Sequence, residues 1–289
     1  MIAKYQQLFR ICHVGILCLI LAGADAGNIP ESGEDLTAEL DAARINGGQL
    51  MNESVPFQVS MQMLRRGRWR HFCSGSIVSE QHVLTAAHCV DKLQVAHLSV
   101  LGGTLNWQLD GRHRHGIVAK HVHPQYTMSP RIINDIALLR VSRPFQLQFA
   151  EIATVPLGDS TRIGRQVPVR LTGWGSITPN STGAQVPDRL QVLNYQTISN
   201  EECVQKGFRV TPNEICALSA PGQGACMGDS GGPLILTASG RPLQLVGIVS
   251  YGSATCAQGK PDVYTRVSSF LPYISKILNQ DLAQATHKQ

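Results

Sequence analysis

A serine flanked by glycines is the strongest chemical signal in this sequence. The stretch 228–232, Gly-Asp-Ser-Gly-Gly, lies between Cys226 and Cys256 and just before an apolar run. Glycine allows backbone angles that other residues avoid, so the amides of Gly228 and Ser230 can both point to one place beside the serine hydroxyl. The stretch therefore predicts a nucleophile, Ser230, next to an oxyanion hole.

Two upstream segments can supply the base and the acid that such a serine needs. His88 follows the small residues Ala86 and Ala87, and Asp135 stands at the start of the apolar run 136–139. A serine hydroxyl is activated by a base whose tautomer a third group fixes. The chain order histidine, aspartate, serine predicts His88 as the base and Asp135 as the acid that orients it. The remaining histidines fit no such motif, so we expect them to be surface or core residues.

Together these motifs resemble those of the chymotrypsin-like serine proteases, and the resemblance runs from Ile45 to about Leu282. It implies an all-β fold of two six-stranded antiparallel β-barrels with the active site between them. It also implies that Ser230 attacks a peptide carbonyl, that His88 moves the proton, and that water hydrolyses an acyl-enzyme. This chemistry requires no cofactor.

Short apolar or alternating runs between Gly and Pro favour the same all-β class. They cover residues 57–63, 76–84, 98–101, 116–121, 136–141, 167–173, 190–198, 234–236, 245–250 and 263–267. We expect the first barrel at about 45–157 and the second at about 158–267. Apolar residues recur at helical spacing after Ser268 and Ser269, which predicts an amphipathic helix at 269–282, packed on the second barrel.

The amino terminus carries the pattern of a secretory signal peptide. Lys4 and Arg10 precede the apolar run 11–21, and the small residues from Ala24 to Ala26 follow. The run is too short to span a bilayer. We therefore expect residues 1–26 to be removed, by cleavage after Ala26 or else after Ala24, and the protein to be secreted into the extracellular space.

Residues 27–44 are predicted to be an activation propeptide. They hold five acidic residues, one basic residue and no aromatic residue, and such polar segments rarely pack. In the family that the sequence resembles, cutting after a residue such as Arg44 frees the amine of Ile45, which pairs with the acid preceding the nucleophile, here Asp229. The protein is therefore expected to be a zymogen that a trypsin-like protease activates. Asn46 departs from the valine more usual there, and the propeptide contains no cysteine that would tether it.

Six cysteines remain after the signal peptide, and sequence alone permits fifteen pairings. The resemblance implies the pairs Cys73–Cys89, Cys203–Cys216 and Cys226–Cys256. A zinc site is the alternative, but no close Cys-x-x-Cys pair supports it.

The resemblance also implies a pocket for the residue before the scissile bond. Its predicted floor is Gly224, where trypsin-like members have aspartate, and Asp262 occupies a wall position that is usually glycine. The other predicted substrate-binding residues are Met227, Ser250, Tyr251 and Gly252, with Ile132 in the neighbouring subsite. The pairing of Gly224 with Asp262 resembles the crustacean and insect collagenolytic proteases of broad specificity.

A carboxylate in a partly buried pocket is costly unless it is paired, hydrated or met by a cation. Asp262 can therefore accept Arg or Lys side chains while the pocket still admits large apolar ones. Alternatively, it turns to a backbone or water partner and leaves a chymotrypsin-like or elastase-like pocket. The sequence keeps both hypotheses open.

The charge of the chain is unevenly distributed. The whole chain carries +5; the segment up to Arg44 holds 3 basic and 6 acidic residues, which leaves 22 Lys and Arg against 14 Asp and Glu, or +8. Four arginines lie in the run 65–70, which we expect to favour acidic residues after the cut. Neither a nucleic-acid-binding fold nor a membrane span is indicated.

The sequence also bears on glycosylation, metal binding and partners. Asn52 and Asn180 match the N-glycosylation pattern. We predict no metal, because the loop after Leu101 supplies only Asp110 as a hard oxygen ligand. We expect a monomer whose partners are protein or peptide substrates and protein inhibitors. A cascade protease with a single target, and a non-catalytic homologue that acts as a binding protein, are the alternative functions.

Overall fold

A computed structural model describes residues 47–109, 111, 113–159, 163–178, 185–237, 240 and 242–286. The predicted signal peptide and propeptide, the activation residues Arg44 and Ile45, the glycosylation candidate Asn180 and the acid Asp110 lie outside these ranges.

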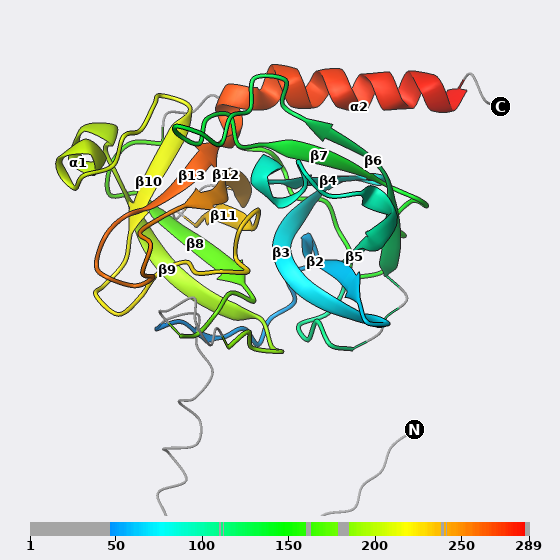
Figure 1. Ribbon diagram of the computed structural model, residues 1–289, viewed down its shortest axis with the longest axis horizontal. Helices are drawn as coiled ribbons and strands as arrows, with labels where there is room; N and C mark the ends of the chain where they lie inside the picture. Colours follow the sequence, from blue (N-terminus) through cyan, green and yellow to red (C-terminus); the bar gives the residue numbers. More distant parts are fainter. Residues whose placement is uncertain are drawn as a thin grey trace, which may run out of the picture.

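The described chain forms two six-stranded antiparallel barrels that lie side by side (Figure 1). The first barrel closes in the order β2-β3-β4-β7-β6-β5, from β2 (Gln58–Arg65), β3 (Arg68–Ser79), β4 (His82–Thr85), β5 (Leu98–Leu101), β6 (Arg114–Val122) and β7 (Ala137–Val141). The second closes in the order β9-β10-β13-β12-β11-β8, from β8 (Pro168–Gly173), β9 (Gln191–Ile198), β10 (Glu214–Leu218), β11 (Pro233–Leu236), β12 (Gln244–Tyr251) and β13 (Asp262–Arg266). The predicted fold class is confirmed.

Strand boundaries differ from the expectation in three places. The run 76–84 is not one strand, because the polar residues Glu80 and Gln81 turn the chain between β3 and β4. β10 was not predicted. The short β1 (Gln49–Leu50) pairs with β9, so the start of the described chain is attached to the second barrel, although the sequence-based boundary assigns it to the first.

Strand β2 illustrates how alternation builds both the core and the contact between barrels. Val59 and Met61 point into the hydrophobic core of the first barrel and are fully buried. The intervening Gln58 is also buried, and its amide donates to the Thr172 carbonyl of β8 at 2.8 Å. Because a buried amide is costly without a partner, this bond fixes how the barrels meet.

The carboxy-terminal helix α2 (Leu271–Thr286) follows the 3-10 helix η4 (Val267–Phe270). The expectation that it packs on the second barrel is wrong for most of its length: Figure 1 shows it running across β7, β4 and β6 of the first barrel. The Tyr273 hydroxyl donates to the His121 carbonyl at 2.6 Å. Within the described residues, no helix is long and apolar enough to cross a membrane.

The reason for this docking is a buried acid near the end of the helix. Asp281 is 5% exposed, and its Oδ2 lies 2.9 Å from His82 Nε2, 3.2 Å from His121 Nε2 and 3.5 Å from Arg140 Nε. These partners come from β4, β6 and β7, all in the first barrel. A buried carboxylate is stable only beside such donors and cations, so it draws the helix over that barrel.

Replacing Asp281 with Asn is expected to lower the free energy of unfolding by about 2 kcal/mol, because three basic groups lose their buried counter-charge. Burial opposes ionisation, but the bond from His82 and the charges of His121 and Arg140 outweigh it and lower the pKa of Asp281. A carboxyl with a lowered folded-state pKa stabilises the fold above its unfolded pKa of about 4, and this stability is lost as pH falls through the folded pKa.

Urea unfolding from pH 7 to pH 2 measures both effects. The difference between wild type and Asp281→Asn should be largest near neutrality and should shrink at acid pH. Asp188→Asn, at an exposed position, is the control. An equally small effect of both variants at pH 7 would contradict the role given to Asp281.

Candidate active site

His88 lies on the 3-10 helix η2 (Ala87–Cys89) and is held by Asp135 at two points. Asp135 Oδ2 lies 2.7 Å from His88 Nδ1, and Oδ1 accepts from the His88 backbone amide at 2.9 Å. Asp135 is 2% exposed and also accepts from the Ser250 hydroxyl at 2.6 Å. Because an ionised carboxylate only accepts, Nδ1 carries the proton and Nε2 is free to take one.

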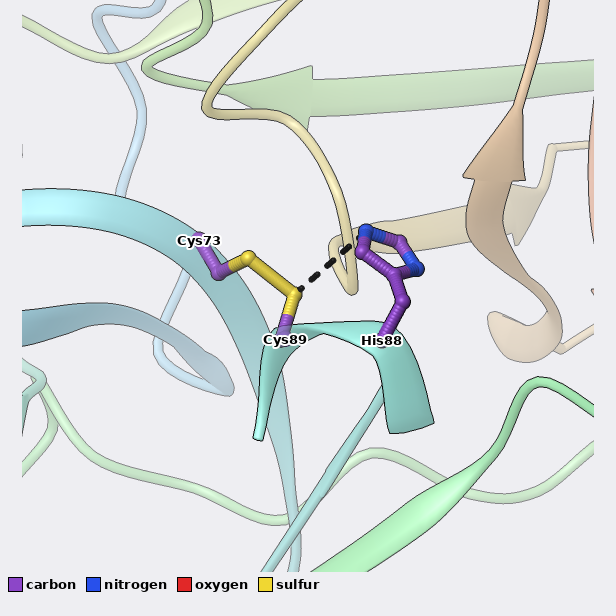
Figure 2. Close-up of side chains that lie close together, drawn as sticks. All are labelled: Cys73, His88 and Cys89. Atoms are coloured by element: carbon purple, nitrogen blue, oxygen red, sulfur yellow. Dashed lines mark hydrogen bonds between the residues drawn. A yellow bond between two sulfur atoms is a disulfide. The ribbon is translucent and has the colours of Figure 1, made fainter. Parts of the chain in front are cut away.

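A disulfide also contacts the histidine ring. Cys89 bonds to Cys73 on β3, and Cys89 Sγ lies 3.8 Å from His88 Nε2 (Figure 2). The three side chains have the proximity of a metal site, but thiolate is the sulfur ligand that metals bind, and both sulfurs are in the disulfide. The other expected disulfides, Cys203–Cys216 and Cys226–Cys256, are also present.

Ser230 is held between the two barrels. Its carbonyl accepts from the Ser74 amide of β3 at 2.8 Å, and the next amide, that of Gly231, donates to Val249 of β12 at 2.9 Å. In the part of the chain that the structure describes, no hydrogen bond joins the Ser230 hydroxyl to His88. Such bonds are often long in unliganded enzymes and tighten when substrate binds.

The loop at the serine contains two backbone amides that make no hydrogen bond among the described residues. Gly228 has a φ of 103°, which favours glycine. Its carbonyl accepts from His71 Nε2 at 3.0 Å and from the Ser74 hydroxyl at 3.3 Å. The backbone amides of Gly228 and Ser230 have no acceptor among the described residues. Two unused donors next to a serine can stabilise a developing oxyanion.

His71 is a site residue that sequence reasoning missed. A carbonyl only accepts, so Nε2 must donate to Gly228, and Nδ1 must accept from the Ser60 hydroxyl, 2.9 Å away. Burial lowers the pKa of His71 to about 4, although the bond to Gly228 opposes this. The ring therefore stays neutral at physiological pH. Its place two residues before Cys73 is the only signal in the sequence.

Asp229 points away from solvent into a space between glycines. Its carboxylate accepts from the backbone amides of Gly175 at 2.8 Å and Cys226 at 2.9 Å. A Cβ on Gly173 or Gly175 would lie 2.0 Å from an Asp229 oxygen, so both positions require glycine. Burial raises the pKa of Asp229 to about 7, although the two backbone bonds lower it. In the described chain no ion pair with a cation neutralises this acid.

A cavity of about 160 Å³ opens beside Ser230. Five predicted pocket residues line it: Met227, Ser250, Tyr251, Gly252 and Asp262. Gly224 and Ile132 are not among the lining residues. Gly224 instead lies behind the cavity, where a Cβ would be 3.5 Å from Asp262 Oδ2.

The Asp262 carboxylate is 8% exposed and presents its two oxygens differently. Oδ2 accepts from the Tyr195 hydroxyl at 2.7 Å and from the Ala225 amide at 2.8 Å. Oδ1 lies against Gly252, where a Cβ would be 2.6 Å away. Burial raises the pKa of Asp262 to about 6, opposed by the bonds from Ala225 and Tyr195.

The remaining predicted residues lie away from this cavity. The arginine run forms the β2–β3 hairpin, where Arg65, Arg66, Arg68 and Arg70 are exposed. Asn52 is exposed as well, which leaves its glycosylation a prediction.

Two barrels, a histidine bound by an aspartate, and a serine loop whose two amides have no acceptor among the described residues are the arrangement expected of a serine peptide hydrolase. Comparison with known proteins agrees. The trypsin family matches residues 44–274. Chymotrypsin-2 of Vespa crabro is 37% identical over 235 residues, which cover 80% of this chain and 98% of that protein. The chain belongs to the trypsin family and is a serine endopeptidase.

Proposed function

We propose that this protein is a secreted endopeptidase, made as a zymogen, that cleaves peptide bonds through Ser230, His88 and Asp135. Two observations together carry the proposal: Asp135 Oδ2 lies 2.7 Å from His88 Nδ1, and the Gly228 and Ser230 amides have no acceptor among the described residues. Its broad or chymotrypsin-like primary specificity extends to Arg and Lys through Asp262.

The geometry suggests a role for each group. His88 Nε2 takes the Ser230 proton as the hydroxyl oxygen attacks the substrate carbonyl, and Asp135 stabilises the imidazolium that results. The Gly228 and Ser230 amides donate to the oxyanion. His88 then gives the proton to the leaving amine. In the second half of the reaction, His88 takes a proton from a water molecule as the water attacks the acyl-enzyme. The carboxylic acid product is released and Ser230 regains its proton.

Activation is proposed to follow a cut after Arg44. Gly47, the first described residue, accepts from the Gln223 side chain at 3.0 Å, in the loop that leads to the pocket and the nucleophile. Ile45 lies two residues upstream in the sequence, and its new amine is proposed to pair with Asp229. A buried charge is costly unless it is paired, so an ion pair between Ile45 and Asp229 would hold the Gly228 loop in its working shape.

The specificity proposal predicts the effect of Asp262→Gly on protein cut after Arg44. The variant should lose about 30-fold in kcat/KM for substrates with Lys or Arg before the scissile bond, since one charge-assisted bond contributes about 2 kcal/mol. Substrates with Phe or Leu should change little. The ratio of Lys to Phe cleavage in wild type should rise with pH through about 6, as Asp262 ionises.

The ratio is informative because any ionisation that changes the cleavage of both substrates equally cancels from it. Asp188→Asn, which removes an exposed negative charge, is the control for net charge. A wild type that never cuts after Lys or Arg, with a profile that Asp262→Gly leaves unchanged, would mean that Asp262 serves only internal partners. The enzyme would then be chymotrypsin-like or elastase-like.

We further propose a monomer that acts on protein substrates and is restrained by protein inhibitors. Two alternatives keep the fold: a cascade protease with one target, and a homologue that binds without cleaving. A serine-directed phosphonate labels only a working nucleophile, so labelling of the cut protein excludes the second. Cleavage of many unrelated peptides argues against the first.

A further inference from the structure

The Asp262 carboxylate is fixed by a side chain from the core of the second barrel and by a backbone amide beside the cavity. Tyr195 is on β9 and is 3% exposed, packed in the core of the second barrel with Tyr264. Its hydroxyl reaches Asp262 Oδ2 at 2.7 Å. Burial, with the nearby charge of Asp262, raises the pKa of Tyr195 well above its usual value. The hydroxyl is thus a permanent donor.

Both accepting directions of Oδ2 are used inside the protein. The Tyr195 hydroxyl and the Ala225 amide donate to this one oxygen, at 2.7 and 2.8 Å. An oxygen of a carboxylate offers about two lone-pair sites. Oδ1 has no hydrogen-bond partner among the described residues and lies on the Gly252 side, where the cavity is.

We propose that Tyr195 is a positioning residue for primary specificity, whose hydroxyl fixes the Asp262 carboxylate so that only Oδ1 meets the cation of a bound side chain. The inference rests on the proposed role of Asp262. A single oxygen suits the compact ammonium of Lys, whereas the guanidinium of Arg makes its strongest contacts with both oxygens of a carboxylate. The wild-type enzyme should therefore cut faster after Lys than after Arg.

The surroundings of Asp262 make this donor important. Two other titratable groups lie near enough for the charge of Asp262 to raise their pKa: Tyr264, next but one on β13, and Asp229 on the nucleophile loop. Neither supplies positive charge. Ionisation therefore depends on the two hydrogen bonds to Oδ2, of which only the one from Tyr195 comes from a side chain that can be exchanged.

The test compares Tyr195→Phe with wild type after cutting at Arg44. Loss of one bond to a charged group should lower the ratio of Lys to Phe cleavage, as kcat/KM, by about tenfold. The pH midpoint of that ratio should rise. If Tyr195 had only a structural role, Tyr195→Phe would lower cleavage after Lys and after Phe by the same factor, and the pH midpoint of their ratio would not change. Leu193→Val, on the same strand and in the same core but without a polar group, is the matched control.

A second measurement does not depend on activity. The carboxyl carbon of Asp262, followed by ¹³C NMR titration in the full chain, should show a higher pKa in Tyr195→Phe and an unchanged one in Leu193→Val. An unchanged pKa in Tyr195→Phe would overturn the inference.

The failures of the two proposals are distinguishable. If Asp262→Gly removes cleavage after Lys but Tyr195→Phe keeps the wild-type ratio and midpoint, the positioning role is wrong and the proposed function stands. If Asp262→Gly has no effect on cleavage after Lys, the specificity proposal and the inference both fall, while cleavage after Phe still supports the endopeptidase.

Discussion

Ser230→Ala is expected to lower kcat for peptide hydrolysis by about 10⁵- to 10⁶-fold, because no other described group beside His88 offers a nucleophile. Loss of the hydroxyl removes the acyl-enzyme route and leaves only binding and the two backbone amides, because alanine keeps the amide of residue 230. Catalytic groups that act as one unit are strongly non-additive. Ser230→Ala combined with His88→Ala should therefore be hardly slower than either variant alone.

Hydrolysis of a chromogenic peptide at pH 8 measures this effect, with phosphonate labelling as a second readout. Ser269→Ala, at an exposed position in η4, should keep full activity and full labelling. Unfolding of Ser230→Ala at the wild-type temperature shows that the fold is intact. Residual activity within a hundredfold of wild type would exclude Ser230 as the nucleophile.

The second large effect concerns Asp229 and the cut after Arg44. In cut protein, Asp229→Asn should lower kcat/KM by about 1000-fold, since removing one partner of a buried ion pair typically costs 3–5 kcal/mol. Arg44→Gln should block activation by trypsin and leave the chain inactive. The measurement is peptide hydrolysis before and after incubation with trypsin, with sequencing of the new terminus.

The pH dependence of the free energy of unfolding of the uncut chain provides an independent check on the burial of Asp229. Asp229 has a folded-state pKa of about 7, above its unfolded value of about 4. The folded state therefore binds more protons between these values, and stability should fall as pH rises from about 4 to 7. After the cut at Arg44, the Ile45 ammonium should pair with ionised Asp229, so the stability of the cut protein should fall much less between about pH 4 and pH 7. An uncut Asp229→Asn variant with the same pH dependence as wild type would contradict the assignment.

The expectations that the sequence alone supports rest on local patterns. His88, Asp135 and Ser230 each lie in a short segment whose neighbours already indicate its chemistry, and the two-barrel fold followed from the resemblance that these segments carry. The cluster of arginines in the hairpin and the helical periodicity of α2 could also be recognised in the sequence. Each of these features depends on residues close together in the chain.

Tertiary structure decided what depends on distant partners. The apolar face of α2 does not specify a barrel; the choice follows from Asp281, which meets His82 some 199 positions away. His71 gained a role only because β3 passes under the Gly228 carbonyl. The partner of Asp262, Tyr195, is 67 positions distant on β9. Sequence determined which groups could do chemistry, and folding determined which of them meet, because burial forces each polar group to find a partner wherever the chain brings one.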